Sequence, residues 1–269
     1  MSTISAKKGT FGLGSGLLFV LAAFGIILAL IRFGRGLAWA TNLNQGYPWG
    51  FWIGFDILAG IALAAGGFVV AGLVHVFGGE KYHPMVRPAI VTAFLGYLLF
   101  IFALLVDLGR PWAIWHMIIY QQPHSPMFEV GFCVMFYTTV LFLEFLPMVF
   151  ERLGWYGAAR AWKSWASWAA IILLVLFALA LTRSTPWVLV IAGVLVLFEL
   201  ATMTGAIRRD PRVPTLLIMA GIIFSTLHQS SLGTLFLMAP HKLSAIWYTP
   251  WLPLLFFTSA VMALSLIHI

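Results

Sequence analysis

The chain has 269 residues, of which 62% are hydrophobic and only 9% are charged, and its mean hydropathy is +1.01. A soluble domain carries about 25% charged residues, so the composition excludes a soluble core and predicts a membrane protein. A single cysteine, Cys133, excludes a disulfide framework or a cysteine-ligated iron–sulfur cluster within the chain. The net charge of +7 comes from short loops, which is a topology signal rather than a nucleic-acid footprint.

Long apolar segments alternate with short polar connections rich in Pro and Gly along the whole chain. A membrane-spanning helix needs about 20 apolar residues. The pattern predicts an all-α, polytopic transmembrane helical bundle that forms a single integral membrane domain over 1–269. About eight spans are expected, at 12–31, 51–77, 89–107, 127–150, 165–182, 187–207, 214–237 and 250–267.

Glycines near the start of the chain predict close contacts between helix backbones. Gly12, Gly14 and Gly16 open the first span, and Gly66–Gly67 lies within the second. Small residues let membrane helices approach each other closely. We therefore expect both groups to be packed against neighbouring helices.

The fourth span has a clear start signal. Ser125 is a good N-cap residue and Pro126 suits the first helical position. This start places Glu129 one turn inside the helix.

The two ends of the chain each allow more than one interpretation. The apolar stretch after Lys7-Lys8 has the length of a span, but Ala38-Trp-Ala40 could be a signal-peptide cleavage site. Arg32 and Arg35, which stand before that site, favour a span. The chain ends at Ile269 inside an apolar run with no basic flank, which predicts a bundle truncated at its C-terminus.

The distribution of basic residues predicts the orientation. Cytoplasmic loops of membrane proteins carry an excess of Lys and Arg, and ten such residues fall on one side of the predicted spans against five on the other. We therefore expect the N-terminus in the cytoplasm and the protein in the cell inner membrane. The richer side holds Lys7, Lys8, Lys81, Arg87, Arg152, Arg160, Lys163, Arg208, Arg209 and Arg212, and the poorer side Arg32, Arg35, Arg110, Arg183 and Lys242.

Ionisable residues lie inside or at the ends of the apolar segments. A charged group at bilayer depth costs about 3 kcal/mol and is a functional-site hypothesis by default. Near the outer face, some of these residues could equally be solvated interfacial charges, and Asp107 and Arg110 could pair locally. Glu144 lies deeper, where it suggests a proton or ion path. The candidates are Asp56, Asp107, Arg110, Glu129, Glu144 and His228.

The seventh span contains the polar run His228-Gln229-Ser230-Ser231. Helix packing alone accounts for the two serines, but the larger His and Gln must both find partners. Histidine is the natural proton donor near neutral pH. This run therefore predicts a binding site in the outer half of the membrane.

Several cofactor classes are disfavoured. Only His75 and His228 lie clearly within spans, near opposite membrane faces, so they cannot share one haem iron. Zinc spacings and phosphate-binding glycine motifs are not found in the sequence. Without haem or metal, a pocket of Asp, Glu, His and Arg suits a quinone, because quinone reduction consumes two protons. A proton-coupled transporter and a purely structural anchor are the alternatives, although transporters usually show an internal repeat.

Six ordered motifs resemble the polysulfide reductase NrfD family of integral membrane subunits, and within it the HybB-type subunits of the hydrogenase-2 class. The likeness covers about 40–165 and 215 to the end. The motifs are Gly46–Asp56, Glu80–Pro88, Asp107–Pro111, Met127–Val130, Leu143–Gly154 and Thr226–Leu235.

The resemblance implies a membrane anchor without cofactors of its own, inactive alone, in a respiratory oxidoreductase complex. Such an anchor passes electrons between a ferredoxin-like iron–sulfur subunit and menaquinone or ubiquinone. The iron–sulfur subunit and a catalytic subunit are expected on the outer, periplasmic face. We expect His228 and Gln229 to bind or protonate the quinone, with Asp107, Arg110, Asp56 and Glu129 completing the pocket and Glu144 on a proton path.

One segment departs from the family pattern. Residues 166–213 look like an extra helical pair relative to the hydrogenase-type members. An even number of added spans leaves the predicted sidedness of the site unchanged.

Overall fold

The computed structural model describes residues 12–44, 54, 61–75, 77–205, 215–242 and 244–267. All regular elements among these residues are helices, which confirms the prediction of an all-α bundle. Short helices α2 (Leu37–Ala40) and α6 (His116–Ile119) connect longer ones. The long helices are α1 (Leu13–Arg35), α4 (Ile61–His75), α5 (His83–Asp107), α7 (Pro126–Arg152), α8 (Tyr156–Thr182), α9 (Thr185–Met203), α10 (Thr215–Met238) and α11 (Leu252–Ile267).

Each predicted span corresponds to one of the long helices. Within the described residues, six helices are long and apolar enough to cross a membrane, whereas α4 and α11 are shorter there. The chain is thus a polytopic integral membrane protein. Asp56 and the other residues of the predicted second span before Ile61, apart from Gly54, lie outside the described residues.

Two helices extend beyond the apolar segments that predicted them. α5 begins at His83 rather than at 89, with Pro84 in its first turn, where a missing N–H costs nothing. α8 begins at Tyr156 rather than at 165. Its first turns bury Ala159 and expose Arg160, so polar side chains continue the helix on one face after hydropathy has fallen. Hydropathy marks only the part of a helix that lies at bilayer depth.

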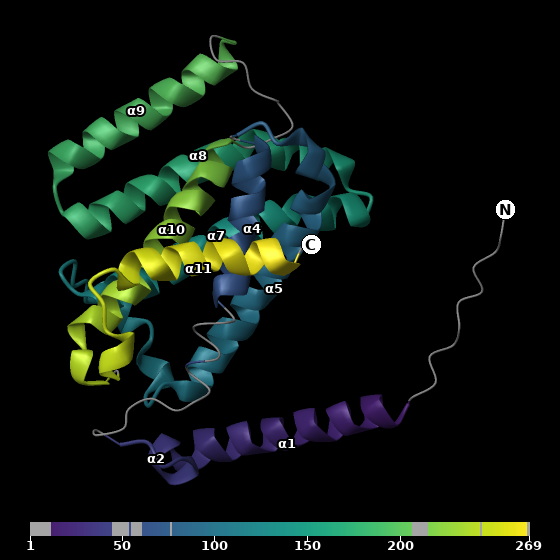
Figure 1. Ribbon diagram of the computed structural model, residues 1–269. Helices are drawn as coiled ribbons and strands as arrows, with labels where there is room; N and C mark the ends of the chain where they lie inside the picture. The colour runs from purple at the N-terminus through teal and green to yellow at the C-terminus, as the bar shows by residue number, and fades with distance from the viewer. Residues whose placement is uncertain are drawn as a thin grey trace.

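The bundle is built around α10, which packs against α4, α7, α8 and α11. α5 joins it by packing on α4 and α7. α9 packs on α8 at the edge of the bundle, and α1 stands apart, with contacts to the short helix α2 that follows it and fewer to α5 (Figure 1). The helix at the centre therefore carries the polar run, and the peripheral helices carry apolar surface.

Glycines allow two of these contacts. A Cβ at Gly233 of α10 would lie 2.5 Å from Cα of Pro253 in α11, and one at Gly67 of α4 would lie 2.5 Å from Cβ of Ala93 in α5. The prediction of close packing at Gly66–Gly67 is thus confirmed at Gly67. The same prediction for the first span is wrong, because a Cβ at Gly12, Gly14 or Gly16 would meet nothing within 4 Å. α1 has no helix beside these glycines among the described residues.

The predicted start of the fourth span is confirmed in α7. The Ser125 hydroxyl accepts a hydrogen bond from the Phe128 N–H at 3.5 Å, and Pro126 is the first helical residue. Glu129 lies in the first turn, where a carboxylate is favoured by the helix dipole. The interpretation of 166–213 as an added pair stays a prediction. Here α8 packs into the bundle and α9 covers it from outside.

Candidate functional site

Three aromatic side chains from three helices meet at one depth in the centre of the bundle. Tyr97 of α5, Tyr137 of α7 and His228 of α10 are each fully buried. The ring centroids of Tyr97 and Tyr137 are 4.5 Å apart, and those of Tyr97 and His228 are 6.0 Å apart, both edge to face. This group, the Tyr97–Tyr137–His228 cluster, is the polar centre of a mostly apolar core.

The cluster has spare hydrogen-bonding capacity. The Tyr97 hydroxyl and both ring nitrogens of His228 make no hydrogen bond of ordinary geometry to any described residue, although the backbone of Val130 lies beside the imidazole. An unsatisfied buried polar group costs about 1–3 kcal/mol. Such groups mark places where water or a ligand completes the site.

Ser225 and Gln229 connect this cluster to a cavity. The hydroxyls of Ser225 and Tyr137 are hydrogen-bonded to each other. Gln229 is buried, and its Nε2 donor has no partner in the described part of the chain. Both side chains line the same cavity, and among the described lining residues the polar groups all come from α10.

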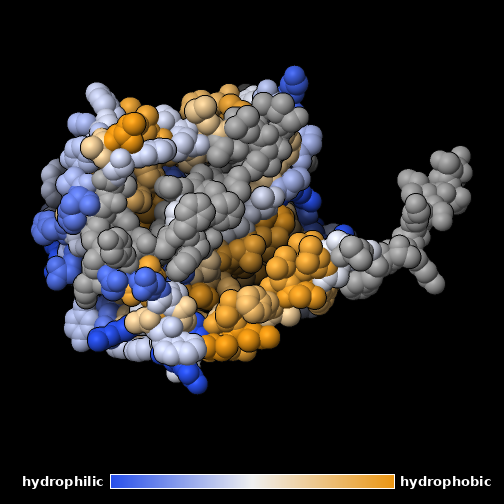
Figure 2. Space-filling view, turned by 60° about the horizontal axis from the view of Figure 1, so that its bottom comes forward, coloured by the Kyte–Doolittle hydropathy of each residue, from blue (hydrophilic) through white to orange (hydrophobic). Residues whose placement is uncertain are grey.

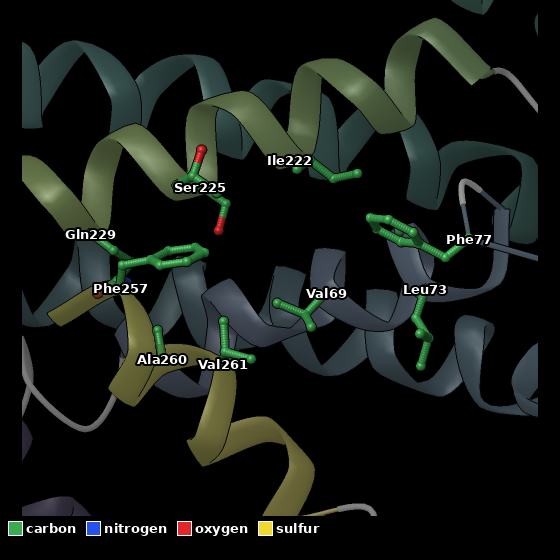
Figure 3. A pocket seen from close by; sticks show the side chains of 11 residues that line it. Val69, Leu73, Phe77, Ile222, Ser225, Gln229, Phe257, Ala260 and Val261 are labelled. Carbon is green, nitrogen blue, oxygen red and sulfur yellow. The ribbon is translucent and has the colours of Figure 1, made fainter. Parts of the chain in front are cut away.

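The cavity lies between α4, α10 and α11 and has a volume of about 310 Å³. Figure 3 shows Ser225 and Gln229 of α10 opposite Phe257 and Val261 of α11, with side chains of α4 on the remaining side. Thr226 of α10 is the third polar lining residue, and the rest of the described wall is apolar, as expected for a pocket that takes a largely apolar molecule and orients it with few polar groups. We call it the α4–α10–α11 cavity.

His228 does not line this cavity. Consecutive residues on an α-helix point about 100° apart, so Gln229 faces α4 and α11 while His228 faces α5 and α7. A chain of contacts joins them: Ser225 to Tyr137, Tyr137 to Tyr97, and Tyr97 to His228. The sequence placed His228 and Gln229 in one pocket, and the structure puts them on two faces of α10.

Glu144 lies two turns from Tyr137 on the same face of α7. Its carboxylate is buried, and neither oxygen has a hydrogen-bond partner among the residues that the structure describes. Pro147, three residues farther along α7, removes one hydrogen bond of the helix because it has no N–H for the Leu143 carbonyl. The indole Nε1 of Trp162 in α8 donates to that carbonyl at 2.9 Å instead. A side chain of the next helix thus secures the backbone beside Glu144.

The remaining predicted site residues that the structure describes lie farther toward one end of the bundle. Asp107 is the last residue of α5, ten residues and therefore about 15 Å along the helix from Tyr97. Arg110 follows it and is exposed, and Glu129 is half-buried in the first turn of α7. Asp107 lines a different cavity from Gln229. The structure therefore separates a deep group from a group near the surface.

Sequence reasoning missed Tyr97, Tyr137 and Arg32. The available signal for the tyrosines was their position in span interiors, since Tyr in membrane helices is enriched at the interfaces instead. Arg32 was counted as a loop charge, but it lies in α1 and only 4% of it is exposed. Its guanidinium donates a hydrogen bond to the carbonyl of Leu108 at the end of α5.

The other histidine within a span has a neighbour of its own. The rings of His75 and His83 lie edge to face, with centroids 5.8 Å apart, where α4 ends and α5 begins. The described residues contain no group of three or more His, Cys, Asp or Glu side chains that could hold a metal ion.

Two known proteins resemble the chain over 90% or more of its length, and a third over about half of it. A protein of Nitratidesulfovibrio vulgaris is 37% identical over 264 residues, which are 98% of this chain and 56% of that protein. The probable Ni/Fe-hydrogenase 2 b-type cytochrome subunit of Escherichia coli is 30% identical over 90% of this chain and 50% of its own length. The menaquinone reductase integral membrane subunit of N. vulgaris is 32% identical over 49% of this chain and 31% of its own.

The chain spans about half the length of the first two of these relatives. No solved structure matches it at a significant level. The family model of polysulphide reductase NrfD matches residues 39–267, a stretch that includes the polar centre of the bundle and the α4–α10–α11 cavity. The chain therefore belongs to the polysulphide reductase NrfD family.

Proposed function

We propose that this chain is the quinone-reactive membrane subunit of a multi-subunit oxidoreductase complex. The observation that carries the proposal is the α4–α10–α11 cavity, where Gln229 offers a donor without a described partner inside apolar walls. A quinone has this chemistry: an apolar body and two carbonyls that accept hydrogen bonds. The named menaquinone reductase subunit among the relatives supports a quinone as the substrate.

Gln229 holds the headgroup by donating from Nε2 to one carbonyl, and the Ser225 hydroxyl lies next to it. Quinone reduction consumes two electrons and two protons, so the site also needs proton donors. The hydrogen bond of Ser225 to Tyr137 provides the last step of the route into the cavity. The ring contacts of Tyr97 with Tyr137 and His228 do not themselves carry protons. In this proposal ordered water bonded to the Tyr97 hydroxyl and the His228 nitrogens, which have no described partner, completes the route, and His228 donates its proton through that water rather than by touching the quinone.

Glu144 extends this route toward the other end of α7. Its carboxylate has no hydrogen-bond partner among the described residues, as suits a group that takes up and releases protons. Asp107, Arg110 and Glu129 belong, in this proposal, to the polar region near the surface on which a ferredoxin-like iron–sulfur subunit docks. That surface faces outward, with a catalytic subunit beyond it, if the N-terminus is cytoplasmic and the protein lies in the inner membrane. Asp56, which lies outside the described residues, is proposed to act with them at the quinone site.

Two glutamines test the quinone site. Replacing Gln229→Leu removes the only described amide at the α4–α10–α11 cavity, and we expect electron transfer from the partner subunits to a menaquinone analogue to fall at least tenfold. Gln121→Leu is the matched control, because Gln121 lines another cavity of similar size, about 360 Å³ between α7 and α8. Equal quinone reduction by the two variants, at equal amounts of assembled complex, would sink the proposed site.

Purification from the native membrane in mild detergent tests the proposed partners. Mass spectrometry should find an iron–sulfur subunit and a catalytic subunit with the chain. A chain that purifies alone and without bound quinone would contradict the proposal.

We also expect the purified chain to lack the absorption bands of a b-type haem. Among the described residues His228 contacts tyrosine and backbone rather than another histidine, and His75 packs on His83. Haem bands that disappear in His228→Leu would overturn this expectation.

A proton-coupled transporter is the second candidate, favoured by one observation: Glu144 is buried in a span with no hydrogen-bond partner among the described residues. Proteoliposomes with an imposed pH gradient discriminate between the two functions. Solute-dependent dissipation of the gradient without any redox partner would favour transport, and it should then be lost in Glu144→Gln.

A further inference from the structure

A second cavity lies between α1 and α5, near the C-terminal end of α5. Its volume is about 860 Å³, within the range of about 300–1,000 Å³ that is usual for ligand sites. Its long walls are apolar, with Ala22, Gly25 and Ile26 from α1 and Phe102 and Ala103 from α5. Figure 2 shows the orange, hydrophobic ridge of α1 with a hollow beside it. We call this cavity the α1–α5 cleft.

One end of the cleft is cationic. Arg32 lines it and is 96% buried, as its exposed fraction is 4%. One guanidinium nitrogen donates to the Leu108 carbonyl, but Nε has no partner among the described residues. An arginine side chain remains charged and carries five N–H donors in a planar fork. A buried guanidinium with a donor left over requires an acceptor, preferably a negatively charged one.

The other charges around this end leave it positive. Asp107 also lines the cleft, but a second arginine, the exposed Arg35, contacts the lining residue Trp39. The Arg35 guanidinium packs over the ring of Trp39, 4.6 Å from its centroid. Tryptophan and arginine together are typical of the membrane–water interface. The cleft thus has a cationic end at headgroup level and an apolar body at acyl-chain level.

We propose that the α1–α5 cleft binds one anionic phospholipid, with its phosphate on Arg32 and its acyl chains between α1 and α5. Phosphate accepts bidentate hydrogen bonds from guanidinium, which a neutral quinone headgroup does not. This inference does not depend on the proposed quinone site, which lies in a different cavity. The lipid would supply packing between two helices that make few contacts with each other directly.

The test compares two arginines that make the same kind of bond. Arg183, like Arg32, donates to a backbone carbonyl of another segment, that of Gln121, but it is exposed and lines none of the three cavities described. The complex is purified in mild detergent, stripped of loosely bound lipid and titrated with phosphatidylglycerol or phosphatidylcholine under native mass spectrometry. We expect one retained phosphatidylglycerol in the wild type and in Arg183→Gln, and at least tenfold weaker retention in Arg32→Gln.

A second variant fills the cleft without touching the arginine. Ala103→Trp should displace the lipid while Arg32 stays in place, and it decides the matter if Arg32→Gln does not fold. Equal retention by Arg32→Gln and Arg183→Gln, or equal retention of phosphatidylcholine, would overturn the proposal. So would a quinone or a second protein chain that occupies the cleft in place of the lipid.

Discussion

The α10 core and the α1 helix are both long and apolar in sequence, yet their surroundings are opposite. α10 is enclosed by four helices and buries polar side chains, including His228 and Gln229. α1 exposes large side chains such as Leu17, Leu18 and Phe19, and a Cβ added at any of its glycines would meet nothing within 4 Å. High hydropathy places both in a membrane, but it does not distinguish a helix that faces protein from one that faces lipid.

The difference lies in what each helix does with its small and polar residues. In α10, Gly233 admits the backbone of α11, and Ser225 connects a tyrosine to a cavity. In α1, the one buried polar side chain in the described residues is Arg32, at the end of the helix. The residues of α10 therefore determine which helices pack against it, whereas the residues of α1 determine mainly where that helix lies across the membrane.

The sharpest way to break this comparison is to enlarge a glycine in each helix. A side chain at Gly233 would meet the backbone of Pro253 and Leu252 at 2.5–2.6 Å, whereas one at Gly25 meets nothing within 4 Å. Overpacking costs about 1–3 kcal/mol or more, so Gly233→Leu should lower the unfolding temperature in detergent strongly and Gly25→Leu hardly at all. Similar losses in both variants would contradict the assignment of α10 as core and α1 as periphery.

The next largest effect concerns the helix hydrogen bond that is missing at Pro147, near Glu144. Trp162→Phe leaves the Leu143 carbonyl without its indole donor and should cost about 1–3 kcal/mol. Pro147→Ala returns an N–H to the helix, so the loss should be much smaller when both changes are combined. Additive losses in this double-mutant cycle, measured by urea unfolding in mixed micelles, would show that the two groups do not share the carbonyl.

Replacing each of the two buried tyrosines with phenylalanine should change the stability of the protein differently. Tyr137→Phe removes a hydrogen bond to Ser225 and should destabilise by about 1 kcal/mol. Tyr97→Phe removes a hydroxyl that has no partner among the described residues, so in the chain without quinone it should be neutral or stabilising. Thermal unfolding of both variants decides this. Equal destabilisation would mean that the Tyr97 hydroxyl has a partner, such as a bound water.

The smallest effect is expected at the surface. Arg87 and Glu151 form an ion pair of 3.0 Å, in which the arginine side chain is 68% exposed. Exposed pairs contribute about 0–1 kcal/mol and are screened by salt. Arg87→Gln should therefore change the unfolding temperature by little. The change should be smaller still at a salt concentration of about 0.5 M, because salt screens the ion pair. A large loss that survives salt would show that this end of the bundle is more tightly packed than the exposure indicates.

The sequence predicted the helical bundle well. Apolar length and the Ser125–Pro126 start signal are local properties, and both predictions are confirmed. The run His228–Gln229 was recognised because two large polar side chains in a span need partners. Which partners they have could not be predicted, since Tyr97 and Tyr137 are separated from them by more than 90 residues.

Composition and motif order by themselves determined that this is a polytopic all-α membrane protein of the NrfD family. Only the tertiary structure decided that His228 and Gln229 face different sides of α10, that Asp107 lines a different cavity from Gln229, and that Arg32 is buried. The physical reason is that hydropathy and caps act within one helix. Rotation of a helix about its axis and the choice of its neighbours depend on side chains that meet only after the helices pack.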